Sequence, residues 1–132
     1  MIVLDASAVV AVLLDPGSGA ERIRERIESP GESLHVPHVM DLEVLHALRR
    51  QALRGALSPR RSAEALEDLA NIMFVRYPHT SLIQRIWELR ENVTAYDAAY
   101  VALAEALDAP LVTMDARLAQ ASGHNAAVEL YR

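Results

Sequence analysis

Short apolar runs alternate along the chain with longer segments of helical periodicity. The first run, Ile2–Leu4, is continuous and branched and ends at Asp5, which is typical of a buried strand that delivers a polar side chain at its carboxyl end. Further short apolar stretches predict four more strands, at Ser33–Val36, Met73–Arg76, Leu111–Thr113 and Ala127–Leu130.

The segments between these strands predict helices. Ser58 before Pro59 is a typical helix start, and Gly55 is a typical stop for the helix that follows Pro37. In that helix, apolar residues recur at Val39, Leu42, Leu45 and Leu48. The predicted helices cover Ala6–Leu14, Ala20–Ser29, His38–Leu53, Pro59–Asn71, Pro78–Glu91, Tyr96–Leu107 and Asp115–Ala121.

The alternation of strands and helices predicts the fold class. It favours an α/β protein, a three-layer α/β/α sandwich around a mostly parallel central sheet. The chain has 132 residues and no internal repeat, low-complexity run or long linker, so we expect residues 1–132 to form a single domain.

Four carboxylates are the candidate catalytic residues. Asp5 and Asp115 each follow a predicted strand, and the carboxyl ends of parallel strands meet at one edge of a sheet. Glu43 lies early in the helix after Pro37, and Asp97 lies in the first turn of a later helix. We therefore expect the four acids to converge on one cleft.

Each acid also has an ordinary structural interpretation. Asp97 comes three residues after Thr94, as in a capping box, and Asp115 is placed to cap the next helix, whereas a strand-end acid such as Asp5 has no evident capping role. Glu43 has the alternative of a solvated helix residue. Asp41 is an alternative to Glu43 as the site residue of this helix. Residues two positions apart on a helix are rotated by about 200°, so both cannot face one cleft; we favour Glu43 and interpret Asp41 as a charge in the first turn that the helix dipole stabilises.

The composition of the chain excludes several kinds of catalytic and metal site. The chain has no cysteine, which excludes disulfides and thiolate metal sites, and all 13 basic residues are arginine, which excludes a Schiff base or a P-loop lysine. Clustered carboxylates raise one another's pKa, and a divalent cation relieves their repulsion; oxygen-only ligands select Mg²⁺ or Mn²⁺. Glu43 and His46 form one Glu-x-x-His pair, but a di-iron site needs two.

Hydroxyl and guanidinium groups lie near the candidate acids in sequence. Ser7 and Thr113 flank the two strand-end acids and are candidates for hydrogen bonds to a ligand carboxylate, or for a simple capping role. The arginine clusters are candidate RNA-phosphate contacts or a solvated face: Arg49, Arg50 and Arg54, then Arg60 and Arg61. The net charge is −5, and without the four candidate acids it is −1, so the remaining surface need not repel RNA.

The chain resembles the PIN-domain ribonucleases, particularly the VapC-type toxins of toxin–antitoxin pairs. Four motifs in order carry the resemblance across nearly the whole chain: Ile2–Ser7, the helix from Pro37 through Glu43 to Arg49, Thr94–Ala104 and Leu111–Asp115. Each motif is short, and their combined order within 132 residues is specific.

The resemblance implies a metal-dependent endoribonuclease with Asp5, Glu43, Asp97 and Asp115 as its acidic quartet. Asp5 and Asp97 would hold Mg²⁺ or Mn²⁺, Glu43 and Asp115 would orient water or hold a second ion, and cleavage would leave a 3′-hydroxyl and a 5′-phosphate. It also implies a cognate VapB-like antitoxin that covers the cleft with an arginine. A homodimer is implied too, for which the apolar helix Leu82–Leu89 is the candidate interface.

Other functions are weighed against this one. Haloacid-dehalogenase-type phosphatases need Asp-x-Asp and a lysine, and receiver domains need a paired acid and a late lysine, whereas this chain has Ser7 two residues after Asp5 and no lysine. A catalytically silent PIN-like module that binds RNA or a partner is the alternative from another class. We expect a cytoplasmic protein, because the start has no signal-peptide pattern and the apolar run Ala8–Leu14 is too short to span a membrane.

Overall fold

Five parallel strands form the central sheet of the computed structural model, which describes residues 1–132. Every neighbouring pair is parallel, and the order across the sheet is β3-β2-β1-β4-β5. The strands are β1 (Ile2–Leu4), β2 (Leu34–Pro37), β3 (Phe74–Tyr77), β4 (Leu111–Thr113) and β5 (Val128–Leu130). All five predicted strands are present, with ends within one residue of the prediction.

The strand order reverses beside β1. The chain proceeds from β1 to β2 and β3 on one side, and later to β4 and β5 on the other. Open α/β sheets bind ligands outside the carboxyl ends of their strands at such a reversal. Asp5 directly follows β1, and Thr113 ends β4, so both lie at this point.

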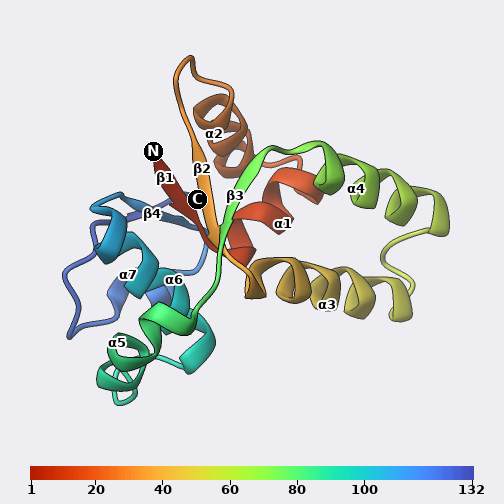
Figure 1. The fold of residues 1–132 in the computed structure, drawn as a ribbon. Helices are drawn as coiled ribbons and strands as arrows, with labels where there is room; N and C mark the ends of the chain where they lie inside the picture. The colour runs from red at the N-terminus through yellow and green to blue at the C-terminus, as the bar shows by residue number, and fades with distance from the viewer.

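Helices cover both faces of the sheet and complete the predicted α/β/α layers (Figure 1). On one side, α1 packs against α2, α3 and α4, and the pair α3–α4 projects away from the sheet. On the other side, α6 contacts β1, β2 and β4, with α5 and α7 beside it. Their bounds are α1 (Ala6–Leu14), α2 (Ser18–Ile27), α3 (Val39–Leu53), α4 (Pro59–Asn71), α5 (Ile83–Glu88), α6 (Ala95–Leu107) and α7 (Ala116–Gln120).

The helix predicted over Pro78–Glu91 is shorter than expected. It starts with a 3₁₀ turn, η1 (Thr80–Leu82), and α5 ends at Glu88. The amides of Arg90 and Asn92 bond to carbonyls three residues back, which tightens the chain and ends the helix before Thr94 caps α6. Helix α2 also differs, because it begins two residues before the predicted start.

The buried stripe of α3 differs from the repeat seen in the sequence. Met40, Val44 and Leu48 are buried, four residues apart, whereas Leu42 and Leu45 are exposed. Residues spaced three apart drift by about 60° per step around a helix, so such a series leaves the buried face. The helix ends as predicted at Gly55, whose φ of 75° suits glycine.

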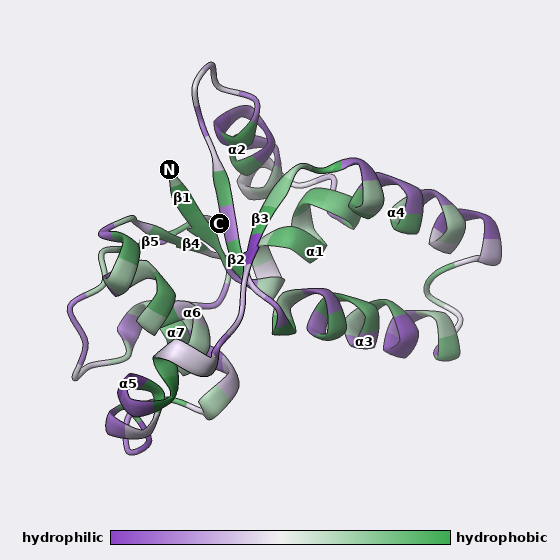
Figure 2. Cartoon of the chain, viewed as in Figure 1, coloured by the Kyte–Doolittle hydropathy of each residue, from purple (hydrophilic) through white to green (hydrophobic).

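The hydrophobic core lies between the sheet and the helices that cover its two faces. Figure 2 shows hydrophobic colouring along the central strands and α1, with hydrophilic colouring toward the outer ends of α3 and α4. All three residues of β1 are at most 1% exposed, as expected for a central strand covered on both faces. No helix combines the length and the hydrophobicity that crossing a membrane requires.

Two arginines fix α2 and α4 to the carboxyl end of α1. Arg24 donates hydrogen bonds to the carbonyls of Ala11, Val12 and Asp15 at 2.5 to 3.1 Å, and Arg61 donates to the carbonyl of Leu13. Carbonyls in the last turn of a helix lack partners within it, so the guanidinium groups satisfy them; the Ala11 carbonyl also accepts a hydrogen bond from the Asp15 amide. The contacts hold α1, and with it the turn that carries Asp5, against its neighbouring helices.

Candidate active site

Asp5 is enclosed at the middle of the sheet's carboxyl edge, where it is 5% exposed. Its Oδ1 accepts hydrogen bonds from the Ala8 amide at 3.0 Å and the Ser7 hydroxyl at 2.7 Å, and its Oδ2 accepts one from the Thr113 hydroxyl at 2.8 Å. Asp5 is therefore the N-cap of α1, and the expectation that it has no capping role is wrong. The helix starts directly after the strand, so its free amides face the carboxylate.

Ser7 and Thr113 also hold the turn that follows β4. The Ser7 hydroxyl accepts a hydrogen bond from the Met114 amide at 3.1 Å, and the Thr113 hydroxyl accepts one from the Asp115 amide at 2.9 Å. Each hydroxyl has a single hydrogen, which it donates to Asp5, so each acts as both donor and acceptor. The ends of β1 and β4 are thereby connected through two side chains.

The surroundings of Asp5 leave little of its carboxylate free for a ligand. A carboxylate oxygen accepts about two hydrogen bonds. Oδ1 already receives two donors and Oδ2 receives one, so one position on Oδ2 is left. Burial raises the pKa of Asp5 to about 6 against the effect of these donors, and the negative charge of Asp97 adds to the rise.

Asp97 lies in the first turn of α6. The hydroxyl of the N-cap residue Thr94 accepts a hydrogen bond from the Asp97 amide at 3.2 Å, so Thr94 caps the helix as predicted. Burial raises the pKa of Asp97, and the negative charge of Asp115 raises it further, while Arg117 opposes the rise. Asp97 is thus within the electrostatic reach of both strand-end acids.

Asp115 is the N-cap of α7, which is one of the two roles that the sequence left open for it. Its Oδ1 accepts a hydrogen bond from the Arg117 amide at 2.9 Å. Its side chain is 29% exposed, and Nε of Arg117 lies 3.7 Å from Oδ1. Both strand-end acids therefore cap helices, but Asp115 is open to solvent.

The two acids of α3 have different partners. Glu43 is partly buried, and its Oε1 accepts a hydrogen bond from the Tyr100 hydroxyl at 2.6 Å. Asp41 forms a two-bond ion pair with Arg76 of β3, at 2.6 and 2.9 Å. Burial raises the pKa of Glu43, and the charge of Asp97 raises it further. Glu43 therefore faces the acids of the cleft, and Asp41 faces β3.

Tyr100 is a site residue that the sequence analysis missed. It is 1% exposed, and burial together with the negative charges of Glu43, Asp5 and Asp97 raises its pKa. Its hydroxyl thus lies among three of the four acids. The available signal was its position three residues after Asp97, which places both side chains on one side of α6.

The donor set fits a divalent metal bound in an open site. No three acidic or histidine side chains surround a common point closely enough to hold an ion by themselves. Mg²⁺ is commonly bound by one or two carboxylates, with water and substrate phosphate as its other ligands. One free position on Asp5, with Asp97 nearby and no lysine to neutralise either, agrees with that kind of site.

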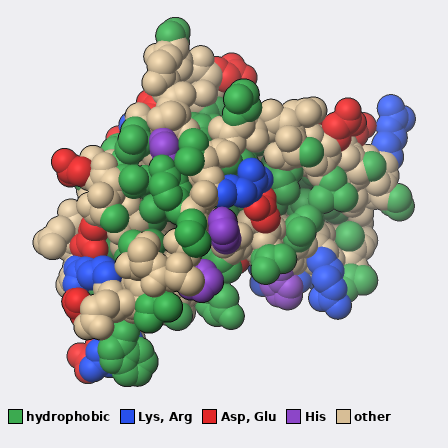
Figure 3. All heavy atoms as spheres, in the orientation of Figure 1, with side chains coloured by type: hydrophobic (Ala, Val, Ile, Leu, Met, Phe, Trp, Pro, Cys, Tyr) green, Lys and Arg blue, Asp and Glu red, His purple; other side chains and the backbone are tan.

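The basic residues predicted on α3 extend away from the acids. Arg50 and Arg54 lie about two and three turns beyond Glu43 on its side of the helix, and Arg49 is rotated by about 120° from them. All three are exposed and have no carboxylate partner within ion-pair distance. Figure 3 shows basic side chains toward the outer ends of α3 and α4. Arg60 and Arg61 belong to α4 and pair with Glu64.

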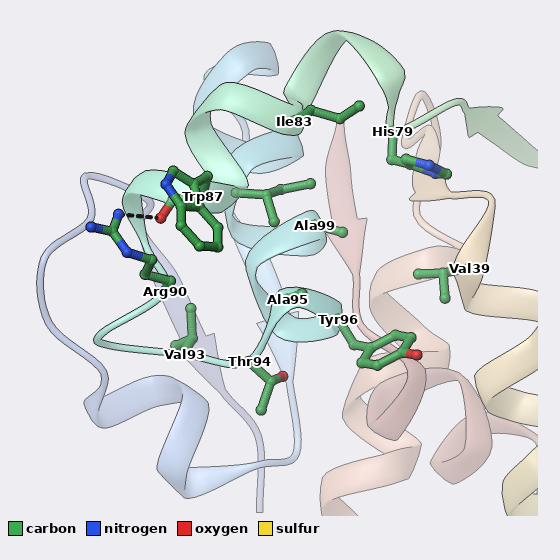
Figure 4. Close-up of a pocket in the computed structure, with 11 residues that line it drawn as sticks. Val39, His79, Ile83, Trp87, Arg90, Val93, Thr94, Ala95, Tyr96 and Ala99 are labelled. Atoms are coloured by element: carbon green, nitrogen blue, oxygen red, sulfur yellow. Dashed lines mark hydrogen bonds between the residues drawn. The ribbon is translucent and has the colours of Figure 1, made fainter.

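Two adjoining grooves lie beside the start of α6. The first is an apolar groove of about 490 Å³ between α5, the start of α3 and the first turns of α6. In Figure 4, Ile83 and Trp87 project from α5, and Tyr96 lies on the side of Val39. The second is a polar groove of about 400 Å³ that includes Asp97. Arg90, Val93 and Thr94 line both grooves.

Comparison with known proteins gives consistent results. Residues 2–123 match the PIN domain family. VapC ribonuclease Mb0985 of Mycobacterium bovis is 48% identical over 89% of this chain and 88% of its own length, and ribonuclease VapC1 of Mycobacterium tuberculosis is 46% identical over 98% and 97%. A solved structure of VapBC2 from Rickettsia felis, bound to a promoter DNA fragment, has the same fold, with a TM-score of 0.72, 14% identity and complete coverage of both chains.

Proposed function

Because the chain belongs to the PIN domain family and its relatives are VapC ribonucleases, we propose that it is a metal-dependent endoribonuclease and the toxin of a toxin–antitoxin module. One observation carries the proposal beyond the family match. Asp5 lies buried at the reversal of the strand order, and burial together with the negative charge of Asp97 raises its pKa and that of Glu43. Acids gathered in this way at the edge of a sheet fit phosphodiester hydrolysis at a metal better than they fit a structural role.

We propose Asp5 and Asp97 as the residues that hold Mg²⁺ or Mn²⁺. When bound, such an ion polarises a phosphate and lowers the pKa of water. The chain supplies the orientation: Ser7, Ala8 and Thr113 fix Asp5 and leave one position on Oδ2 for a ligand. No lysine competes for these carboxylates.

Glu43 and Asp115 have the complementary role of orienting water or holding a second ion. The Tyr100 hydroxyl holds Oε1 of Glu43, which leaves Oε2 to accept a hydrogen bond from the attacking water. Asp115 keeps one of its carboxylate oxygens engaged as a helix cap, and its partial exposure allows contact with water. Arg50 and Arg54 extend the same side of α3 and are proposed to bind RNA phosphates farther along the strand, with Arg49 at the edge of that surface.

The function is tested by incubating the purified chain with total RNA. We expect cleavage with Mg²⁺ or Mn²⁺, no cleavage in EDTA, and restored cleavage when the metal is added back. Asp5→Asn and Asp97→Asn are expected to abolish cleavage while the circular dichroism spectrum stays unchanged. Cleavage that persists in EDTA would rule out the metal mechanism, and RNA binding without any product would favour a catalytically silent module.

An antitoxin partner follows from the same site. A partner segment with an arginine would place a positive charge among four carboxylates, where such a pair forms charge-assisted hydrogen bonds. Expression of the chain alone is expected to arrest growth in the cytoplasm of a bacterial host. Co-expression with the protein of the adjacent reading frame, or the Asp5→Asn change, is expected to relieve the arrest, and arrest by Asp5→Asn would contradict a toxic nuclease.

We also propose a homodimer that uses the apolar groove. The predicted interface helix turns Leu82 and Leu89 into the core, whereas Ile83 and Trp87 are 58% and 63% exposed beside that groove. Exposed apolar surface of this kind marks an interaction site. Ile83→Asp is expected to convert a dimer to a monomer in light scattering, and Leu53→Asp on α3, at a residue that is 70% exposed, serves as its control.

A further inference from the structure

Five of the 13 arginines have partners within the fold that occupy the guanidinium group. Arg24 and Arg61 donate to carbonyls at the end of α1. Three others donate to carboxylates, Arg26 to Glu129, Arg76 to Asp41 and Arg85 to Glu105. These five contribute to the fold rather than to a binding surface.

Arg90 and Arg117 differ from that group. The Arg117 side chain is 94% exposed, and its nearest carboxylate oxygen is 3.7 Å away, beyond hydrogen-bond distance. Arg90 donates to the Trp87 carbonyl at 2.9 Å and lies over the Trp87 ring, 4.6 Å from its centre (Figure 4). Arg117 is thus in a long ion pair with Asp115 that occupies none of its hydrogen-bond donors, and Arg90 has no carboxylate partner, while the Trp87 ring orients its guanidinium.

The polar groove brings these two arginines to the edge of the acidic cleft. It is lined by Arg90, Asn92, Thr94, Asp97 and Arg117, together with Glu91, Val93 and Leu118. Arg117 already acts on the cleft, because its charge lowers the pKa of Asp97. The groove therefore has two cations and an amide beside one of the proposed metal ligands.

We propose that this polar groove binds the RNA phosphate next to the one that is cut. The proposal rests on the endoribonuclease function and specifies how that site holds its substrate. A strand whose scissile phosphate lies at Asp5 and Asp97 must carry its neighbouring phosphates past the edges of the cleft. On the α3 edge the open cations are Arg50 and Arg54, and on the opposite edge they are Arg90 and Arg117.

The chemistry of the groove favours a phosphate over the other parts of a nucleotide. Guanidinium groups bind phosphate oxygens through paired hydrogen bonds, and Asn92 offers a further amide donor. A base would be expected on apolar or aromatic surface, and no aromatic side chain lines this groove. Glu91 and Asp97 oppose an anion, and a divalent ion held by Asp5 and Asp97 would neutralise the second of these charges.

The test is the salt dependence of RNA binding. In the Asp5→Asn background, which prevents cleavage, the dissociation constant of a fluorescein-labelled oligouridylate is measured by anisotropy with Mg²⁺ at several KCl concentrations. Each phosphate contact in single-stranded RNA contributes about 0.7 to the slope of log K against log salt. Arg117→Gln and Arg90→Gln are each expected to reduce the slope by about 0.7, and the double change by about 1.4.

Two controls make the outcome decisive. Arg117→Lys keeps the charge and is expected to keep the slope. Arg22→Gln removes an exposed arginine of α2 that donates to the Arg132 carbonyl, and is expected to leave the slope unchanged. An unchanged slope in the double variant overturns the phosphate site, and a changed oligomeric state with an unchanged slope assigns the groove to a protein contact instead. Failure of the unmodified chain to cut RNA would overturn the function itself, which is measured separately.

Discussion

The ends of β1 and β4 look alike in sequence and differ in structure. Each strand is an apolar run followed by an aspartate, and each aspartate caps a helix. Asp5 is enclosed by three donors, and its pKa is raised to about 6. Asp115 has a 29% exposed side chain and an arginine beside it. The same local pattern thus produces one buried acid and one open acid.

Strand register explains the difference. Leu4 pairs with Val112, and the Asp5 amide bonds to the Val112 carbonyl, so the residue level with Asp5 on β4 is Thr113. Asp115 comes two residues later, beyond the end of the sheet. A strand followed by an acid therefore predicts the edge where the side chain emerges, while register decides how deeply it is buried.

The largest expected difference between the two acids is in catalysis. Asp5→Asn is expected to lower the RNA cleavage rate by about 10³-fold or more, because several kcal/mol of transition-state stabilisation depend on the ion that Asp5 would hold. Asp115→Asn is expected to lower it by about 10- to 100-fold, as for a residue that orients the ligands. Single-turnover cleavage of one labelled RNA measures both, and equal losses would place Asp115 on the metal.

The next expected effect is on the pH dependence of the free energy of unfolding, and it comes from Asp5. Its folded pKa of about 6 lies above the usual 3.8, so the folded state binds this proton more tightly than the unfolded state does. The resulting stability is complete below about pH 4 and is lost as the pH rises through 6. Without divalent ions, we expect the chain to lose about 3 kcal/mol from this residue between those limits.

Urea unfolding at pH 4, 5, 6 and 7 in EDTA measures that loss. Glu43 and Asp97 act in the same direction, and Glu105, whose pKa Arg85 lowers, acts in the opposite one. The difference between the unmodified chain and Asp5→Asn isolates Asp5, since asparagine keeps the cap. The two free energies should converge toward pH 4, with the variant more stable at pH 7. If the free energies of unfolding of the two proteins changed in parallel with pH, burial of the Asp5 carboxylate would cost no stability.

Much of the fold was predictable because local signals agreed with one another. The five strands, the parallel sheet and the caps at Ser58 and Thr94 follow from apolar runs and from capping chemistry that involves a few neighbouring residues. Asp5 and Asp115 could be assigned to one edge because each follows a strand, and the carboxyl ends of parallel strands meet there. Each of these inferences needs only short segments of sequence.

The missed features depend on contacts between distant segments. The bond from Tyr100 to Glu43 joins residues 57 positions apart, whereas the bond from Thr113 to Asp5, across 108 positions, is one of the roles that the sequence left open for Thr113. No local sequence pattern predicts that Oδ2 of Asp5 keeps one acceptor position free for a ligand. The wrong prediction of the buried face of α3 has a different origin. Residues spaced three apart resemble a helical repeat, but each step falls short of a full turn, so the series leaves the buried face.

Thr113 connects the two strand ends, so its hydroxyl should matter to both. Thr113→Val removes a donor to Asp5 and an acceptor for the Asp115 amide, and leaves buried polar groups unpaired. We expect a loss of about 1–3 kcal/mol in the free energy of unfolding at pH 7, together with slower cleavage. Thr113→Ser keeps the hydroxyl and should restore the cleavage rate. A full rate in Thr113→Val would show that Asp5 keeps its position without this bond.

The smallest expected effect separates the two roles of Asp115. Asp115→Asn removes the charge and keeps the helix cap, whereas Asp115→Ala removes both. The two variants should therefore cleave RNA equally slowly, and only the alanine variant should lose about 1 kcal/mol of unfolding free energy. Urea unfolding and single-turnover cleavage of the same two proteins provide the measurement. If Asp115→Ala cleaved RNA much more slowly than Asp115→Asn, Asp115 would contribute to the reaction through its helix cap and not through its charge.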